Sequence, residues 1–213
     1  MSDSYLTLAG TGNGYYESKK SKFYGICRSV SSREDAAEFF AAVKERYKDA
    51  SHYVMAFTLR NGTAQASDDG EPSGTAGKPL LDCIERQGIT DAAVVVVRYF
   101  GGTLLGTGGL VRAYSSAAAE CVQDAGTCEM RRAAKIEAVV DYSLIKPAQL
   151  MFAEMGAVTE DTEYSGSVKF TVWCLEDAAP SVIARLRDMS SGSAVTNITA
   201  KAFKPETFFA AKK

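Results

Sequence analysis

Three carboxylates lie within four residues in the segment Asp68-Asp69-Gly70-Glu71. Carboxylates this close repel one another unless a positive charge offsets them, and Arg98, Arg112, Lys78 or a metal ion could supply it. Residues 65–79 have no apolar periodicity and are dense in turn-forming residues, which predicts a loop. Because loops of this length without secondary structure are often functional, this acidic loop is the first candidate for a binding or catalytic site.

A second candidate is a glycine-rich turn that follows the most apolar stretch of the chain. Residues 92–97 are two alanines and four valines, which indicates a strand buried on both faces. Five glycines then fall within nine residues: Gly101, Gly102, Gly106, Gly108 and Gly109. Their backbone N–H groups can approach a ligand or another loop closely, and the start of the helix expected next favours an anion. Close packing of strand and helix, without a ligand, is the alternative.

The glycine turn matches neither of the common phosphate-binding fingerprints. No Gly-Lys-Ser/Thr sequence ends it, and Val111 stands where the third glycine of a dinucleotide-binding turn would be. Arg98 lies between the strand and the turn, and a guanidinium is costly to bury unless it is paired. We therefore predict that Arg98 forms an ion pair with a carboxylate of residues 68–71.

The single histidine, His52, belongs to a stretch that alternates like a strand, residues 51–59. It falls on the less apolar of the two faces. A hydrogen-bonded structural histidine and a site residue both fit this position, since histidine is a common proton shuttle and metal ligand.

The densest basic cluster of the first half is Lys19, Lys20 and Lys22, at the tip of an expected hairpin. The cluster fits a solvated tip or a patch that faces phosphates. The formal net charge is -2 and neither half of the chain is basic, so a nucleic-acid site would have to gather its positive groups locally. Arg112, one turn into the helix after the glycine turn, is a further candidate.

The length of 213 residues favours two domains. Elements after residue 128 follow the order strand-helix-strand-strand-helix-strand, the split βαβ or ferredoxin-like arrangement. We therefore predict an α+β protein with domains at residues 1–127 and 128–205 and a tail at 206–213. No segment has the apolar length of a membrane span or the pattern of a secretory signal. Five scattered cysteines fit a reducing cytoplasm and argue against a disulfide framework or a zinc site.

Two long segments, Ser67–Pro79 and Val97–Tyr114, resemble the hallmark segments of the IMPACT family in its bacterial, two-domain YigZ-type form. Lys19–Gly25 and Ser51–Phe57 are similar to the lesser motifs of that family. The resemblance implies that the first domain has the fold of the C-terminal domain of ribosomal protein S5 and of domain IV of elongation factor G. It implies that the second domain is similar to domain V of elongation factor G.

The resemblance implies a non-catalytic, translation-linked regulator that binds RNA, the ribosome or a translation-associated protein. No cofactor and no membrane partner are expected, and the expected location is the cytoplasm. The alternative is a metal-dependent hydrolase that acts on a phosphate-containing substrate at the acidic loop and the glycine turn. The candidate site residues, besides the three lysines, are His52, Asp68, Asp69, Gly70, Glu71, Ser73, Gly74, Thr75, Arg98, Gly101, Gly102, Gly106, Gly108, Gly109 and Arg112.

Overall fold

The computed structural model describes residues 4–210, which form two compact units. The N-terminal unit spans Tyr5–Cys128, and the C-terminal unit contains residues 129–210 together with Ser4. The division lies one residue after the position expected from the sequence. Within the described residues, no helix combines the length and the hydropathy that crossing a membrane requires.

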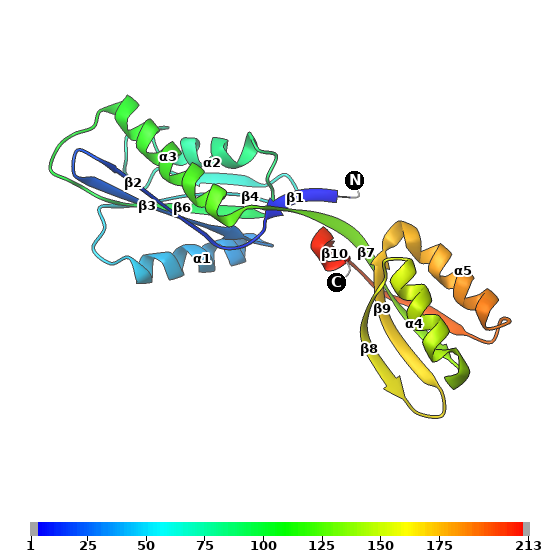
Figure 1. The fold of residues 1–213 in the computed structure, drawn as a ribbon. Coiled ribbons are helices and arrows are strands. Elements are labelled where there is room, and N and C mark those ends of the chain that lie inside the picture. The colour runs from blue at the N-terminus through cyan, green and yellow to red at the C-terminus, as the bar shows by residue number, and fades with distance from the viewer. Residues whose placement is uncertain (1–3, 211–213) are drawn as a thin grey trace. The chain divides into compact units, whose positions relative to one another are not determined.

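The N-terminal unit has three layers, with one antiparallel sheet between two layers of helices (Figure 1). The strand order is β2-β3-β6-β4-β5. Helix α1 covers one face of the sheet, and helices α2 and α3 cover the other. The elements of this unit are β2 (Gly12–Ser18), β3 (Ser21–Ser29), α1 (Arg33–Arg46), β4 (His52–Thr58), β5 (Ala64–Ser67), α2 (Gly77–Glu85), β6 (Ala92–Tyr99) and α3 (Thr107–Ala125).

The central strand β6 is buried on both faces, as its four valines predict. Val94 and Val96 pack with the residues of α2 and α3, whereas Val95 and Val97 pack with those of α1. Because side chains alternate along a strand, Arg98 emerges on the same face as Val96. The guanidinium is thereby directed toward the layer that holds α2 and α3.

Glycines of β2 and β3 allow α3 to lie close against the sheet. A Cβ atom at Gly25 would lie 2.3 Å from the carbonyl oxygen of Ala117, and one at Gly12 would lie 1.9 Å from that of Cys121. Real Cβ atoms do not come this near to backbone. Close approach of α3 therefore depends on the absence of side chains at these strand positions.

Side chains of α3 also occupy the outer edge of β2, which is the last strand on its side of the sheet. The backbone N–H of Asn13 donates to Asp124 Oδ2 at 2.8 Å, and that of Tyr15 donates to Glu120 Oε2 at 2.9 Å. Edge N–H groups that would otherwise face solvent are thus satisfied by carboxylates.

The C-terminal unit is the split βαβ, ferredoxin-like arrangement that the sequence predicts. Its strands follow the order β10-β7-β9-β8. Strand β1 (Ser4–Leu8) belongs mainly to the N-terminal unit, where Leu8 is part of the core that α2 and α3 share with the sheet. The core gathers around Phe152 and Phe170, whose rings meet edge to face at 5.5 Å. The elements are β7 (Thr127–Val140), α4 (Ile145–Glu154), β8 (Val158–Tyr164), β9 (Val168–Leu175), α5 (Ala179–Met189) and β10 (Val195–Pro205).

Two segments expected to lack secondary structure are more ordered than the sequence suggests. The stretch 65–79 contains the end of β5 and the start of α2, so the loop proper is confined to residues 68–76. The tail expected at 206–213 begins with a 3-10 helix, Glu206–Phe208, and the rings of Phe208 and Phe209 meet at 5.1 Å. Residues 211–213 of that tail lie outside the described residues.

Candidate functional site

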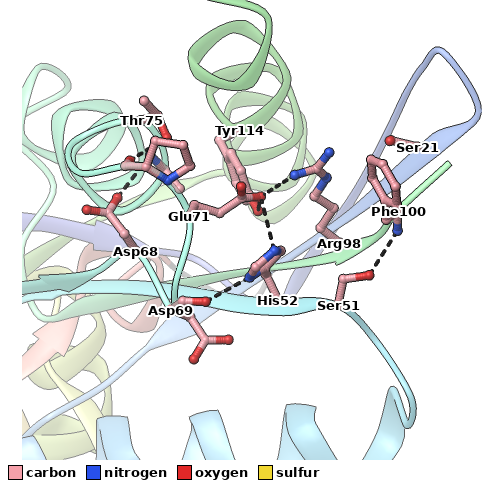
Figure 2. Close-up of polar contacts among 12 residues, drawn as sticks. Ser21, Ser51, His52, Asp68, Asp69, Glu71, Thr75, Arg98, Phe100 and Tyr114 are labelled. Carbon is pink, nitrogen blue, oxygen red and sulfur yellow. Dashed lines mark hydrogen bonds and ion pairs between the residues drawn. The ribbon is translucent and has the colours of Figure 1, made fainter. Parts of the chain in front are cut away.

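Arg98 and Glu71 form a buried ion pair, which confirms the predicted link between the central strand and the acidic loop. Arg98 Nη1 lies 2.6 Å from Glu71 Oε1, and the two side chains are 5% and 4% exposed. The hydroxyl of Tyr114 on α3 donates to the same oxygen at 2.7 Å (Figure 2). Glu71 therefore ties together the loop, the end of β6 and the third turn of α3.

Aromatic rings enclose this ion pair. The Arg98 guanidinium lies 5.4 Å from the ring centroid of Phe23 on β3 and 5.4 Å from that of Phe100 after β6. Burial and the hydrogen bond to Glu71 both raise the pKa of Tyr114, so its hydroxyl remains a neutral donor. Arg98 Nε is buried and has no hydrogen-bond partner among the described residues. The rings partly offset the cost of burying the charge.

His52 lies at the rim of the same cluster, opposite Arg98 in the β4–β6 register. Its Nδ1 donates to the backbone carbonyl of Asp69 at 2.7 Å, and its Nε2 lies 3.9 Å from Glu71 Oε1. Its side chain is 26% exposed. These contacts fit a hydrogen-bonded structural histidine, the first of the two interpretations of His52, because the ring connects the acidic loop to β4.

Asp68 and Asp69 organise the backbone of the acidic loop. Asp68 Oδ1 accepts from the N–H groups of Ala76 and Gly77, and its Oδ2 accepts from that of Gly74 at 2.8 Å. Asp69 Oδ2 accepts from the backbone N–H of Tyr53 at 2.6 Å. Burial acts to raise the pKa of Asp68, but the three N–H groups outweigh it and hold that pKa below the ordinary value. Asp68 thus satisfies the free N–H groups at the start of α2.

The other candidate residues of the loop shape its turns. Asp69 and Gly70 have φ of +44° and +84°, and Gly74 has φ of +75°. The hydroxyl of Thr75 donates to the carbonyl of Pro72 at 2.6 Å. Ser73 is exposed at the outside of the loop.

Replacing Asp68 with asparagine should destabilise the N-terminal unit by about 1–2 kcal/mol at neutral pH, because charged hydrogen bonds to three N–H groups are weakened. Since the folded-state pKa of Asp68 is lowered, its contribution is present above the ordinary pKa near 3.8 and is lost as the pH falls through the folded value. Chemical denaturation across pH measures this. The difference between wild type and variant should narrow below about pH 4.

The matched control for this prediction is Glu45→Gln, which removes one exposed carboxylate from α1. It should leave stability within about 0.5 kcal/mol at every pH. An Asp68→Asn difference that stays constant down to pH 2 would show that the carboxylate charge is not what holds the loop.

The carboxylates of the acidic loop are all engaged by protein groups. Asp68 and Asp69 accept from backbone N–H groups, and Glu71 accepts from Arg98 and Tyr114. Among the described residues, no three His, Cys, Asp or Glu side chains are grouped so that they could hold a metal ion. Arg98 provides the offsetting charge that the sequence requires, whereas Lys78 pairs with Asp82 at 2.6 Å.

The glycine turn lies directly against the tip of the lysine hairpin. A Cβ atom at Gly101 would lie 2.1 Å from the backbone carbon of Lys20, and the Gly101 N–H donates to Ser21 Oγ at 3.0 Å. Lys19 Nζ donates to the carbonyl of Leu104 at 3.3 Å. We name this the basic hairpin surface: Lys19, Lys20, Lys22 and the turn of residues 100–106.

The remaining glycines of the turn differ in whether the local structure requires a glycine. Gly102 and Gly106 have φ of +82° and +73°, which favours glycine. Gly108 has open space where a Cβ would stand, so packing does not require a glycine there. Gly109 has only the side chain of Leu105 near it, at 3.0 Å. Arg112 is exposed on the second turn of α3.

The predicted site residues thus divide into a buried cluster, centred on Glu71, and an exposed surface, centred on the hairpin lysines. The sequence interpretation missed Tyr114 because its spacing fits the apolar stripe of α3. It also missed the aromatic residues beside the lysines. The available signal was a basic residue followed by two aromatic residues, which occurs in both Lys22-Phe23-Tyr24 and Arg98-Tyr99-Phe100.

Both units match families known from other proteins, and together they define a two-domain α+β protein. The Impact N-terminal domain matches residues 19–122, and a domain of unknown function, DUF1949, matches residues 139–193. A crystal structure titled as that of a hypothetical protein covers 94% of this chain and 99% of its own, with a TM-score of 0.64 and 28% identity.

Two curated relatives match nearly the whole chain at 30% identity. "IMPACT family member YvyE" of Bacillus subtilis strain 168 aligns over 90% of this chain and 89% of its own length. "IMPACT family member YigZ" of Escherichia coli K12 aligns over 90% and 96%. The chain belongs to the IMPACT family, in its two-domain YigZ-type form.

Proposed function

We propose that this protein is a non-catalytic, translation-linked regulator that binds RNA through the basic hairpin surface. The observation that carries the proposal is the junction of the lysine hairpin and the glycine turn. Lys19 and Lys20 form the two-residue turn between β2 and β3, with φ of +46° and +65°, and both side chains are exposed together with Lys22. Three positive charges within four residues are thereby exposed together at the tip of one hairpin.

The glycine turn, which contacts the hairpin through Gly101 and Leu104, leads into further groups suited to phosphates. Gly108 is exposed in the first turn of α3, a helix of 19 residues, and Arg112 is exposed one turn later. Backbone N–H groups at a helix start and cationic side chains both bind phosphate. Such contacts position a nucleic acid without reading its sequence, so we expect modest affinity with little sequence preference.

The geometry supports binding over hydrolysis. The hydrolase alternative needs carboxylates free to hold a metal ion or to act on a substrate. Instead, the carboxylates of the acidic loop accept hydrogen bonds from the protein, and Glu71 and Arg98 are buried against each other. We infer that the acidic loop supports the surface from within rather than performing chemistry.

A Lys19/Lys20/Lys22→Gln variant should bind RNA more weakly than the wild type and with a smaller salt dependence. Each lost phosphate contact should reduce the slope of log K against log salt by roughly 0.7 for a single strand. Fluorescence anisotropy with a labelled RNA across a salt series measures both quantities. A Lys146/Lys169/Lys201→Gln variant, with the same net charge but changed in the C-terminal unit, should retain wild-type affinity and slope.

Co-sedimentation with ribosomes, using the same two variants, tests the link to translation. The wild type and the C-terminal control should co-sediment at low salt, and the hairpin variant should not. Equal RNA affinity and equal slope for wild type and hairpin variant would refute the proposal and would favour a protein partner instead.

A further inference from the structure

A hollow lined by aromatic and basic side chains lies beside the hairpin lysines. Its volume is about 520 Å³, and we name it the aromatic hollow after the residues that line it: Lys20, Lys22, Tyr24, Tyr47, Tyr99 and Phe100. Lys22 and Tyr24 belong to β3 and Tyr99 to β6. Lys20 immediately precedes β3, Tyr47 immediately follows α1, and Phe100 immediately follows β6. The hollow lies wholly within the N-terminal unit.

Contacts within the hollow hold the aromatic rings in place. The Tyr24 ring lies 5.5 Å from that of Tyr47 and 6.0 Å from that of Tyr99, the latter edge to face. The Tyr99 hydroxyl donates to the carbonyl of Lys48 at 3.0 Å. Ordered rings lose little freedom when a ligand stacks on them, so the hollow is pre-organised for a flat ligand.

Phe100 leaves much of its ring in solvent. It is 48% exposed, although it closely follows a strand that is buried from Ala92 to Arg98. One side of the ring receives the Arg98 guanidinium, and its backbone N–H donates to Ser51 Oγ at 3.1 Å. A single exposed apolar residue is ordinary on a protein surface. Several aromatic rings that are held in place and exposed together indicate a binding surface.

The charge around the rings selects the kind of ligand. Lys20 and Lys22 line the hollow itself, and Arg46 lies over the Tyr47 ring at 5.3 Å. Two acidic residues lie nearby: Asp49, whose charge adds to burial in raising the pKa of Tyr99, and Glu17, which is opposite Lys22 in the β2–β3 register. Aromatic platforms combined with cations that follow a backbone are the features by which proteins bind single-stranded nucleic acids.

We propose that the aromatic hollow binds an unpaired base of a single-stranded RNA, with Lys20 and Lys22 on the neighbouring phosphates. This inference rests on the proposed function and adds the state of the RNA that the protein selects. The bases of a duplex are already stacked on one another and cannot reach the rings. The protein should therefore prefer single strands and loops over paired RNA.

The test compares two oligonucleotides with identical phosphates. One is an eight-nucleotide oligouridylate, and the other carries abasic sites in place of its central bases. The wild type should bind the oligouridylate on the order of tenfold more tightly than the abasic strand, since stacking contributes about this factor per base. Phe100→Leu and Tyr47→Leu should each reduce that ratio toward one.

Matched controls separate stacking from folding and from charge. Tyr164→Leu removes a 60% exposed aromatic ring from the C-terminal unit and should leave the ratio unchanged. Thermal melting verifies that each variant is folded. A blunt RNA duplex should bind wild type and Phe100→Leu equally, because only phosphate contacts remain.

Two outcomes would overturn the inference. The first is equal binding of the oligouridylate and the abasic strand by the wild type. The second is an unchanged ratio in both ring variants while they remain folded. Either result, obtained while the hairpin lysine variant still loses affinity, would leave the proposed function intact and remove only the stacking of bases. If the abasic strand, the ring variants and the hairpin lysine variant all left the affinity unchanged, both this inference and the proposed function would be contradicted.

Discussion

Replacing Arg98 with alanine should lower the free energy of unfolding by about 3–5 kcal/mol, because the Glu71 carboxylate would remain buried without its charge partner. Both side chains are almost fully buried, and the Tyr114 hydroxyl, a neutral donor, would still donate to the carboxylate. Thermal melting and chemical denaturation of the full chain measure the loss, which should appear in the transition of the N-terminal unit.

The loss of stability should come from the buried, unpaired charge of Glu71 rather than from the lost contact area. A double variant, Arg98→Met with Glu71→Leu, removes both charges and should be less destabilised than Arg98→Ala. Lys78→Ala serves as the control, since it removes an exposed ion pair with Asp82 and should cost at most about 1 kcal/mol. An Arg98→Ala protein that melts like the wild type would disprove the structural role of the pair.

The second large effect is expected from Gly25→Ala. A Cβ at this position would lie 2.3 Å from the carbonyl oxygen of Ala117, and the obstacle is the backbone of α3 rather than a flexible side chain. The helix must move away from the sheet, and overpacking of this kind costs typically about 1–3 kcal/mol, occasionally more. Denaturant unfolding should show this loss in the midpoint with a similar slope.

The matched control is the same substitution at Gly108. A Cβ there meets nothing within 4 Å, and the position lies in the first turn of α3. Because alanine favours helix and restricts the unfolded chain, Gly108→Ala should be neutral or stabilising by up to about 1 kcal/mol. Similar losses from both variants would mean that helix–sheet distance is not what Gly25 maintains.

The ion pair at the centre of the N-terminal unit can be predicted from the sequence because an arginine that ends an apolar strand needs a carboxylate. The sequence does not predict which of the three carboxylates pairs with the arginine, because that depends on the path of the loop. Asp68 and Asp69 both turn toward backbone N–H groups, which leaves Glu71 for Arg98. The hydrogen bond from Tyr114 to Glu71 cannot be predicted either, because a tyrosine in the apolar stripe of a helix is expected only to pack in the core.

The fold of the C-terminal unit follows from its element order, because alternation and helical spacing are local properties. The aromatic hollow does not, because its rings come from elements far apart in the sequence. Tyr24 and Tyr99 meet only when β3 pairs with β6, and Tyr47 joins them only through the packing of α1. Such a surface is a product of tertiary structure.

The carboxylates that α3 places along β2 bear on how this protein avoids aggregation. An unpaired edge strand is a template on which another chain, native or misfolded, can extend a sheet. An incoming strand at β2 would have to displace Asp124 from Asn13 and Glu120 from Tyr15, and would meet two negative charges. At the opposite edge, β5 is only four residues long. Sheet extension is thus discouraged at both ends, which leaves side chains and loops as the means by which the N-terminal unit meets other molecules.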